Sequence, residues 1–182
     1  ESAENAIHSN ECGINAIAIV APYYFKPAGA LQLAEFCARI AESVPELPVY
    51  FYHIPVLTGC NIDMFSFLKE AAPIIPNLAG IKYTHEDFMD FLSCIHFMDG
   101  KYDMLWGRDE NLLSALILGT RAGVGSTFNY AAPLYYQLIA AYDRGDFHSA
   151  RLLQQKSIDM IRLLGKYGGI ATGKAYLKYL GF

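Results

Sequence analysis

The sequence predicts an α/β fold in which a parallel sheet is covered by helices. Short apolar segments of strand length alternate with amphipathic segments of helical period along the first two thirds of the chain. Strands that are apolar on both sides are typical of parallel sheets, and their alternation with helices is typical of β/α units. The last third of the sequence reads as helices only.

Five strand-like segments and the helices around them follow in order. Their ends lie about 20 to 30 residues apart, which matches single β/α units, since a (β/α)8 barrel averages roughly 31 residues per unit. Glycines at 145 and at 168–169 mark helix ends. The expected strands end near Pro22, His53, Thr84, Trp106 and Ser126 (the last strand being 123–126), and the expected helices are 1–12, 30–43, 63–72, one from about 86, 110–118, 131–142, 147–165 and 170–180.

The choice between a barrel and an open doubly wound sheet depends on where the polar residues lie. Both architectures give the same alternation of strands and helices. Here polar residues cluster at the C-terminal end of every expected strand, where barrel enzymes place their active sites. Because only five such strands are present, the sequence favours part of a barrel.

Composition narrows the function classes. The 182 residues are 53% hydrophobic with a net charge of -4, so there is no basic patch for nucleic acid or for an anionic membrane. The apolar stretches are too short to span a membrane. The cysteines at 12, 37, 60 and 94 form no CxxC pair. We expect reduced thiols in a cytoplasmic protein, without a disulfide framework or a zinc site.

Lys82 lies inside the apolar segment Gly80–Thr84. Such a strand solvates an ammonium poorly, which favours the neutral, nucleophilic amine. Alternation lets Lys82, Thr84 and Tyr52 point to one side of the sheet, where a phenol could move protons around a carbonyl that the amine attacks. The alternatives are a lysine that reaches solvent and a core tyrosine. The pair predicts a Schiff-base enzyme, and alternation turns His53 toward the helices as a packing residue.

Two later clusters are candidates for binding a ligand. Gly107 and the pair Asp109–Glu110 follow the fourth expected strand, and Gly125–Thr127 ends the fifth. Acidic residues at a helix start are commonly N-caps and dipole partners. In a binding site, the glycine would admit a ligand to the backbone and the carboxylates would accept hydrogen bonds from its hydroxyls. Such a pair suits a polyhydroxylated substrate, to which Ser126 would add a hydroxyl.

Four ordered motifs match a family: Tyr52–Gly59, Gly80–Thr84, Gly107–Glu110 and Gly123–Asn129. Together with Ala21–Pro27 they resemble the N-acetylneuraminate lyases, class I aldolases of the dihydrodipicolinate synthase superfamily. The resemblance covers essentially the whole chain. It implies a partial (β/α)8 TIM barrel, about strands 4–8, followed by C-terminal helices. Residues 1–130 would form the C-terminal portion of the barrel, and residues 131–182 its last helix and a C-terminal helical extension.

The resemblance also implies roles for single residues. It makes Lys82 the lysine that forms the Schiff base and Tyr52 the phenol that moves the proton beside the substrate carboxylate. It implies no cofactor, because the covalent imine forms on the lysine itself. Its ligands would be pyruvate and a sugar acid, and the full-length protein would be a cytoplasmic homotetramer. The remaining positions are Thr84, Gly107, Asp109, Glu110 and Ser126 for the hydroxylated tail of the sugar, and Tyr24 at a subunit interface beside the active site.

Two places favour a sugar acid as the substrate. Synthases of the superfamily usually carry an arginine where this chain has Val56–Thr58, and they lack the Asp109–Glu110 pair. The resemblance thus implies cleavage of N-acetylneuraminate to pyruvate and N-acetylmannosamine. Dihydrodipicolinate synthase and a 2-keto-3-deoxy sugar acid aldolase remain alternatives.

One family segment is missing from this sequence. The segment Gly-Thr/Ser-Thr-Gly-Glu, which grips the keto acid carboxylate in the family, has no match here. The resemblance therefore implies an N-terminally truncated fragment. An alternative of another class is a non-catalytic fragment that acts as an assembly partner.

Overall fold

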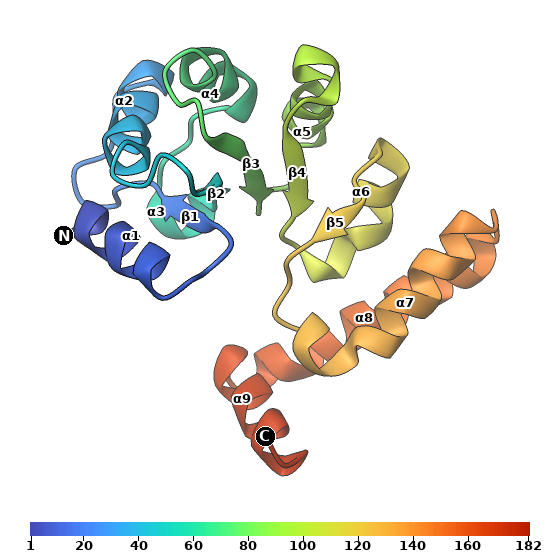
Figure 1. Cartoon of the computed structure of the whole chain (residues 1–182). Helices are drawn as coiled ribbons and strands as arrows, with labels where there is room; N and C mark the ends of the chain where they lie inside the picture. Colours follow the sequence, from blue (N-terminus) through green and yellow to red (C-terminus); the bar gives the residue numbers. More distant parts are fainter. The chain divides into compact units, whose positions relative to one another are not determined.

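The computed structural model describes all residues, 1–182 (Figure 1). The chain forms two compact units, Glu1–Leu105 and Trp106–Phe182, and each is described by itself. The strands are β1 (Ile17–Val20), β2 (Val49–His53), β3 (Leu78–Tyr83), β4 (Asp103–Trp106) and β5 (Ala122–Gly123). The helices are α1 (Ser2–Glu11), α2 (Ala30–Ala41), α3 (Pro55–Thr58), α4 (Met64–Ala71), α5 (Phe88–Ile95), η1 (Phe97–Gly100), η2 (Asp109–Asn111), α6 (Leu112–Leu118), α7 (Phe128–Asp143), α8 (Phe147–Lys166) and α9 (Ile170–Tyr179).

The strands follow one another in the sheet in chain order, from β1 to β5. β1 pairs with β2 in parallel, and β2 pairs with β3 in parallel. Parallel neighbours need a crossover connection, and here helices supply it between successive strands. The predicted α/β fold with a parallel sheet is confirmed.

One face of the strands in the first unit is covered by helices. Phe51 of β2 packs on Phe67 of α4 with 4.7 Å between ring centres, and Tyr83 of β3 packs on Phe91 of α5 at 5.0 Å. All four side chains are fully buried. α4 lies between α2 and α5 and contacts both (Figure 1).

The opposite face of these strands is less covered, and we call it the Lys82 face. Side chains alternate along each strand, so it is formed by every second residue. Its strand positions are exposed or half-buried, apart from a buried glycine. Its members are Ala18, Val20, Tyr50, Tyr52, Gly80, Lys82, Asp103 and Leu105.

A buried carboxylate fixes the strand that carries Lys82. Asp90 accepts hydrogen bonds from the backbone N–H groups of Met64 and Phe65, both at 2.9 Å, and from Tyr83 Oη at 2.8 Å. These bonds satisfy amide groups at the start of α4 that have no partner within the helix. Asp90 therefore ties α5 to α4 and to the end of β3.

The second unit consists mainly of helices. α8 packs along α7 and also contacts α6, α9 and η2. Tyr135, Leu138 and Ala150 are buried between these helices. Helix α7 is kinked at Ala131, where Pro133 two residues later removes an amide donor.

Two local predictions differ from the structure. The strand expected at 123–126 ends at Gly123, and the following helix begins at Phe128 and not near Ala131. The reason is that the backbone at Thr127 is bound by the Asp109 carboxylate and leaves the sheet. The four-residue helix α3 was not expected, although it has a proline at its start and ends at Gly59 with a φ of 63°.

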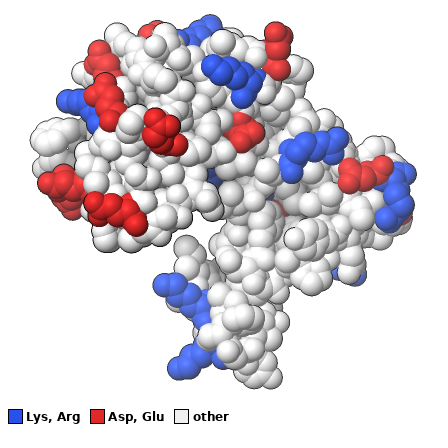
Figure 2. All heavy atoms as spheres, viewed as in Figure 1, with Lys and Arg blue, Asp and Glu red and all other residues white.

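Figure 2 shows acidic and basic side chains scattered over the face in view, without a continuous basic patch. No helix of the structure combines the length and the apolar character that a membrane-spanning segment requires.

Candidate active site

Lys82 and Tyr52 lie together in the first unit. They are register partners on the paired strands β3 and β2, and Lys82 Nζ lies 3.9 Å from the centre of the Tyr52 ring. Both side chains are half-buried. A cation over the face of an aromatic ring is attracted by the ring's quadrupole, so this contact orients the amine. The expectation that alternation brings the two side chains to one face is confirmed.

Thr84 follows directly after β3 and carries a hydroxyl without a partner. Its backbone N–H donates to the carbonyl of His53 at 2.8 Å, which extends the β2–β3 pairing by one step. Its Oγ1 is buried and has no hydrogen-bond partner. Burying a hydroxyl without a partner costs about 1–3 kcal/mol. A polar group of a bound ligand would remove that cost.

His53 points to the helix side of β2, as alternation predicted. It is 3% exposed and lies against the rings of Tyr83 and His85, with centre distances of 5.0 and 5.5 Å. Burial, helped by the nearby His85, lowers the pKa of His53 to about 4. The imidazole is therefore a neutral packing group near pH 7 and does not belong to the Lys82 face.

Tyr24 lies in the connection between β1 and α2 and is 82% exposed. Its ring touches Phe25 edge-on, with 4.8 Å between centres. Val56 and Leu57, just after β2, are also largely exposed. Large apolar side chains follow the C-terminal ends of both strands.

Asp109 is the best-anchored predicted site residue of the second unit. It is buried, and its Oδ2 accepts hydrogen bonds from Thr127 N at 2.7 Å and Thr127 Oγ1 at 2.5 Å. Burial raises the pKa of Asp109, although the two bonds from Thr127 act in the opposite direction. The N-cap interpretation is not supported, because η2 has no side-chain cap.

The network around Asp109 extends to α8. Its carbonyl accepts a hydrogen bond from Gln154 Nε2 at 3.1 Å, and Ser157 Oγ bonds Tyr135 Oη at 2.8 Å. Gly125 passes so close that a β-carbon there would clash with Asp109 Oδ1. Asp109 thus holds the 125–127 segment and α8 in place.

The other three predicted residues of this unit are less buried. Glu110 Oε1 pairs with Arg108 Nη2 at 2.7 Å, and both side chains remain about one third exposed. Ser126 is exposed, and its carbonyl accepts a hydrogen bond from Asn129 Nδ2 at 3.0 Å. Gly107 is half-buried after β4. Glu110 and Ser126 therefore present polar atoms at the surface of this unit.

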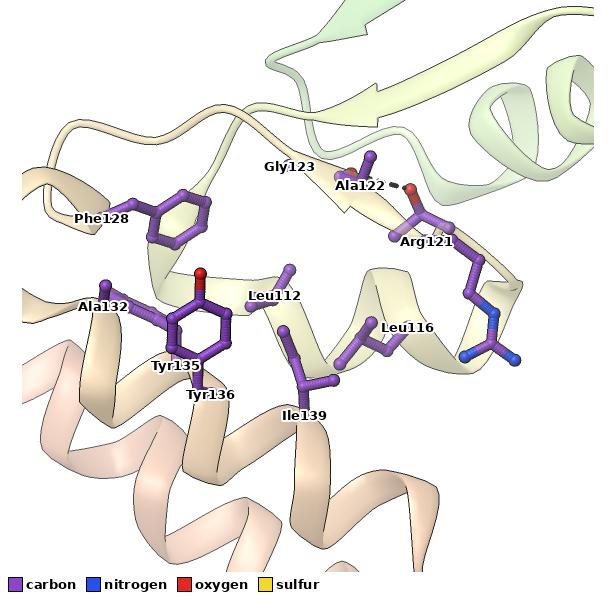
Figure 3. A pocket seen from close by; sticks show the side chains of 11 residues that line it. Leu112, Leu116, Arg121, Ala122, Gly123, Phe128, Ala132, Tyr135, Tyr136 and Ile139 are labelled. Atoms are coloured by element: carbon purple, nitrogen blue, oxygen red, sulfur yellow. Dashed lines mark hydrogen bonds between the residues drawn. The ribbon is translucent and has the colours of Figure 1, made fainter.

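An apolar pocket of about 240 Å³ lies in the second unit between α6, β5 and α7. Figure 3 shows Phe128, Tyr135 and Ile139 of α7 pointing toward Leu112 and Leu116 of α6. None of the predicted site residues lines it. We assign no chemistry to this pocket. Elsewhere, no group of three or more His, Cys, Asp and Glu side chains is placed to hold a metal ion.

Two contacts of the site were missed by the sequence analysis. Thr127 was included in the candidate segment Gly125–Thr127 as a ligand-binding residue, but its bond to Asp109 was not predicted. Tyr50, two residues before Tyr52, bonds Asp103 on the Lys82 face at 2.7 Å. Alternation already placed Tyr50 on the face of Tyr52, but its partner lies 53 residues away.

A family model described as the dihydrodipicolinate synthetase family matches residues 1–182. The chain is 37% identical over 179 residues to the N-acetylneuraminate lyase of Rattus norvegicus, and 36% identical over 181 residues to that of Homo sapiens. The matches cover 97% of this chain and 56% of each relative. The chain therefore spans little more than half the length of these relatives.

Solved structures show the same relationship. The Proteus mirabilis N-acetylneuraminate lyase matches with a TM-score of 0.94 and 39% identity, covering 98% of this chain and 60% of that one. The lyase of Aliivibrio salmonicida matches with a TM-score of 0.93 and 37% identity, covering 97% and 59%. The solved structures that match this chain are TIM barrels. Because the chain covers only a part of each, the predicted partial barrel is confirmed.

Proposed function

The chain belongs to the dihydrodipicolinate synthetase family, and on that premise we propose that it carries the Schiff-base lysine of an N-acetylneuraminate lyase. The observation that carries the proposal is the contact of Lys82 Nζ with the Tyr52 ring at 3.9 Å. An amine and a phenol on adjacent strands are the two groups that imine-based carbon–carbon cleavage needs. Lyases from rat and Proteus mirabilis, similar over 97% and 98% of this chain, support the choice of substrate.

The proposed reaction begins with the Lys82 amine attacking the C2 ketone of open-chain N-acetylneuraminate. Loss of water gives a protonated imine, which acts as an electron sink. As the C3–C4 bond breaks, Tyr52 accepts the proton of the C4 hydroxyl and passes its own phenol proton to the substrate carboxylate. The bonding electrons form an enamine on Lys82, and N-acetylmannosamine leaves. Protonation of the enamine at C3 and hydrolysis of the imine release pyruvate and restore the free amine. No metal or organic cofactor takes part.

The remaining residues would bind the substrate. Thr84 Oγ1 is buried without a partner beside the end of β3, which suits a polar group of the bound sugar acid. Gly107, Glu110 and Ser126 would contact the hydroxylated tail. Asp109 would contribute to tail binding mainly by ordering the 125–127 segment, since its carboxylate is already bound by Thr127.

The proposal extends to assembly. Exposed apolar side chains at Tyr24, Phe25 and Leu57 fit a subunit interface beside the active site, in a full-length cytoplasmic homotetramer. Residues 1–130 would supply the barrel portion, and residues 131–182 its last helix and the C-terminal extension.

The test measures pyruvate release from two substrates and pyruvate consumption with a third, on this chain and on a form extended with upstream residues of its gene. We expect release from N-acetylneuraminate, much less from 2-keto-3-deoxygluconate, and no condensation of pyruvate with aspartate semialdehyde. The Lys82→Ala variant should be inactive. Faster turnover of the deoxygluconate would make the chain a sugar acid aldolase, and condensation would make it a synthase.

The assembly-partner alternative is favoured by one observation. A groove of about 510 Å³ runs along the edge strand β1, between α1 and α2, and is lined by the apolar Ile14, Ile17 and Val20 among others. An apolar strand edge without charge or proline is a surface for pairing with another chain. A chain that binds a partner but releases no pyruvate in any form would support this alternative.

A further inference from the structure

The Lys82 face carries one acidic side chain, Asp103. Along β1 to β4 this face has two charged residues, Lys82 and Asp103. Asp103 Oδ2 accepts a hydrogen bond from Tyr50 Oη at 2.7 Å. The reaction proposed above uses neither Tyr50 nor Asp103.

Gly80 makes the bond between Tyr50 and Asp103 possible. Tyr50 and Gly80 are register partners on β2 and β3, and Asp103 lies on β4. A β-carbon at Gly80 would clash with the main-chain carbonyl of Asp103. The Tyr50 side chain therefore reaches over β3 at its one residue without a side chain.

Strand geometry allows the Lys82 amine to reach the Asp103 carboxylate. Gly80 and Lys82 are two residues apart on one strand, a rise of about 6.6 Å. The flexible four-carbon stem of a lysine spans such a distance. The structure nevertheless shows no ion pair between Lys82 and Asp103, and the amine lies over the Tyr52 ring. An ion pair would favour the protonated amine, which is not nucleophilic.

We propose that Tyr50 is a positioning residue that holds the Asp103 carboxylate away from Lys82 and so keeps the amine available for imine formation. The inference rests on the proposed Schiff-base function. In this arrangement the Tyr50 phenol is hydrogen-bonded to the Asp103 carboxylate, which would otherwise form an ion pair with the Lys82 amine.

The phenol is suited to this task because it stays protonated. Burial, the hydrogen bond to Asp103 and its negative charge raise the pKa of Tyr50 to about 12. Tyr50 therefore remains a hydrogen-bond donor throughout the neutral pH range. Neither Tyr50 nor Asp103 is fully buried, so their hydrogen bond competes with water. The charged Asp103 carboxylate strengthens the bond, because hydrogen bonds to ionised acceptors are stronger than neutral ones.

The experiment compares Tyr50→Phe, Asp103→Asn and the double variant with the wild type. The readout is the rate at which pyruvate and cyanoborohydride modify Lys82, followed by peptide mass mapping. Tyr50→Phe should slow the modification about tenfold, since the freed Asp103 carboxylate then pairs with the Lys82 amine. Asp103→Asn should not slow it, and the double variant should return to within about twofold of the wild type. Tyr142→Phe, which loses a comparable phenol bond to Leu116 O at 2.9 Å, is the matched control.

A purely structural pair gives a different pattern. Asp103→Asn would then slow the modification as much as Tyr50→Phe, and the double variant would be no faster than either. That pattern, or a wild-type rate in Tyr50→Phe, overturns the inference. Circular dichroism checks that each variant is folded. If Tyr50→Phe does not fold, the rate of Asp103→Asn decides alone, and a rate below that of the wild type overturns the inference.

A second readout separates this inference from the proposed function. Reductive methylation by formaldehyde and cyanoborohydride measures the availability of the Lys82 amine without any keto acid, with exposed Lys156 as the internal reference. If pyruvate modifies no form of the protein, the proposed function fails. The same ranking of variants in methylation would still support the role of Tyr50, and equal methylation in all of them would overturn it.

Discussion

Lys82 Nζ and the Tyr52 ring face each other across two paired strands, 3.9 Å apart, at register-partner positions. Neither side chain depends on a loop for its position. Tyr83, next to Lys82, is bonded on the opposite face to Asp90 at 2.8 Å, which fixes the end of β3. The contact with the ring and the chemistry of the phenol hydroxyl can therefore be separated by substitution.

Tyr52→Phe keeps the ring under the amine and removes the hydroxyl. We expect formation of the pyruvate imine on Lys82 to persist, while kcat for cleavage falls about 10²- to 10⁴-fold, the usual contribution of a general acid–base group. Borohydride trapping and steady-state cleavage rates measure the two effects. Tyr52→Ala should impair both, and equal loss of both in Tyr52→Phe would contradict the assigned role.

Gly80→Ala should destabilise the first unit. The added methyl group meets the Asp103 carbonyl, and overpacking of this kind costs about 1–3 kcal/mol. Urea unfolding followed by circular dichroism measures the change in the free energy of unfolding. Gly165→Ala, in helix α8 with no atom within 4 Å of its new methyl, should instead stabilise by about 0.5–1 kcal/mol. A neutral Gly80→Ala would show that the close approach is absent.

Asp109→Ala should destabilise the second unit, because it leaves the buried N–H of Thr127 without its acceptor, while the Thr127 hydroxyl keeps Tyr135 Oη as a partner. An unsatisfied buried group costs about 1–3 kcal/mol. Thermal unfolding checks this, with the exposed Asp159→Ala as the control. If Asp109→Ala unfolds at the wild-type temperature, the carboxylate does not hold the 125–127 segment.

Stability should fall as the pH is lowered through the window set by His53. Its pKa is about 4 in the folded protein, against 6.5 as the ordinary value, so the unfolded chain binds more protons between these pH values. The stabilising contribution is present above pH 6.5 and is lost as the pH falls toward 4, by an amount on the order of 3 kcal/mol.

The His53→Phe variant checks this pH dependence. It should flatten the curve of unfolding free energy between pH 6.5 and 4, measured by urea titration at several pH values. The exposed His148→Asn is the matched control and should keep the wild-type slope. An unchanged slope in His53→Phe would mean that another group controls acid stability.

Local patterns predicted much of the fold and the placement of Lys82 beside Tyr52. Alternation along two apolar strands was enough to place Lys82 with Tyr52 and to turn His53 toward the helices, because side-chain direction in a strand has a period of two. The end of β5 was wrong for a reason that no local pattern contains. The bond from Thr127 to Asp109, 18 residues away, takes the backbone out of the sheet.

The Tyr50–Asp103 pair was unpredictable for the same reason. It joins residues 53 positions apart and depends on a glycine of the strand between them. A glycine inside a strand can signal a close approach of another backbone, but the sequence does not say of which one. Helix α3 is different, since Pro55 and Gly59 mark its ends in the sequence itself.

The most direct test of the central claim is mass spectrometry of the protein after treatment with pyruvate and sodium borohydride, with peptide mapping. If Lys82 forms the Schiff base, a reduced pyruvate adduct appears on Lys82, in this chain or in the form extended with upstream residues, and none appears in Lys82→Arg. An adduct on another lysine, or no adduct in either form, would contradict that claim.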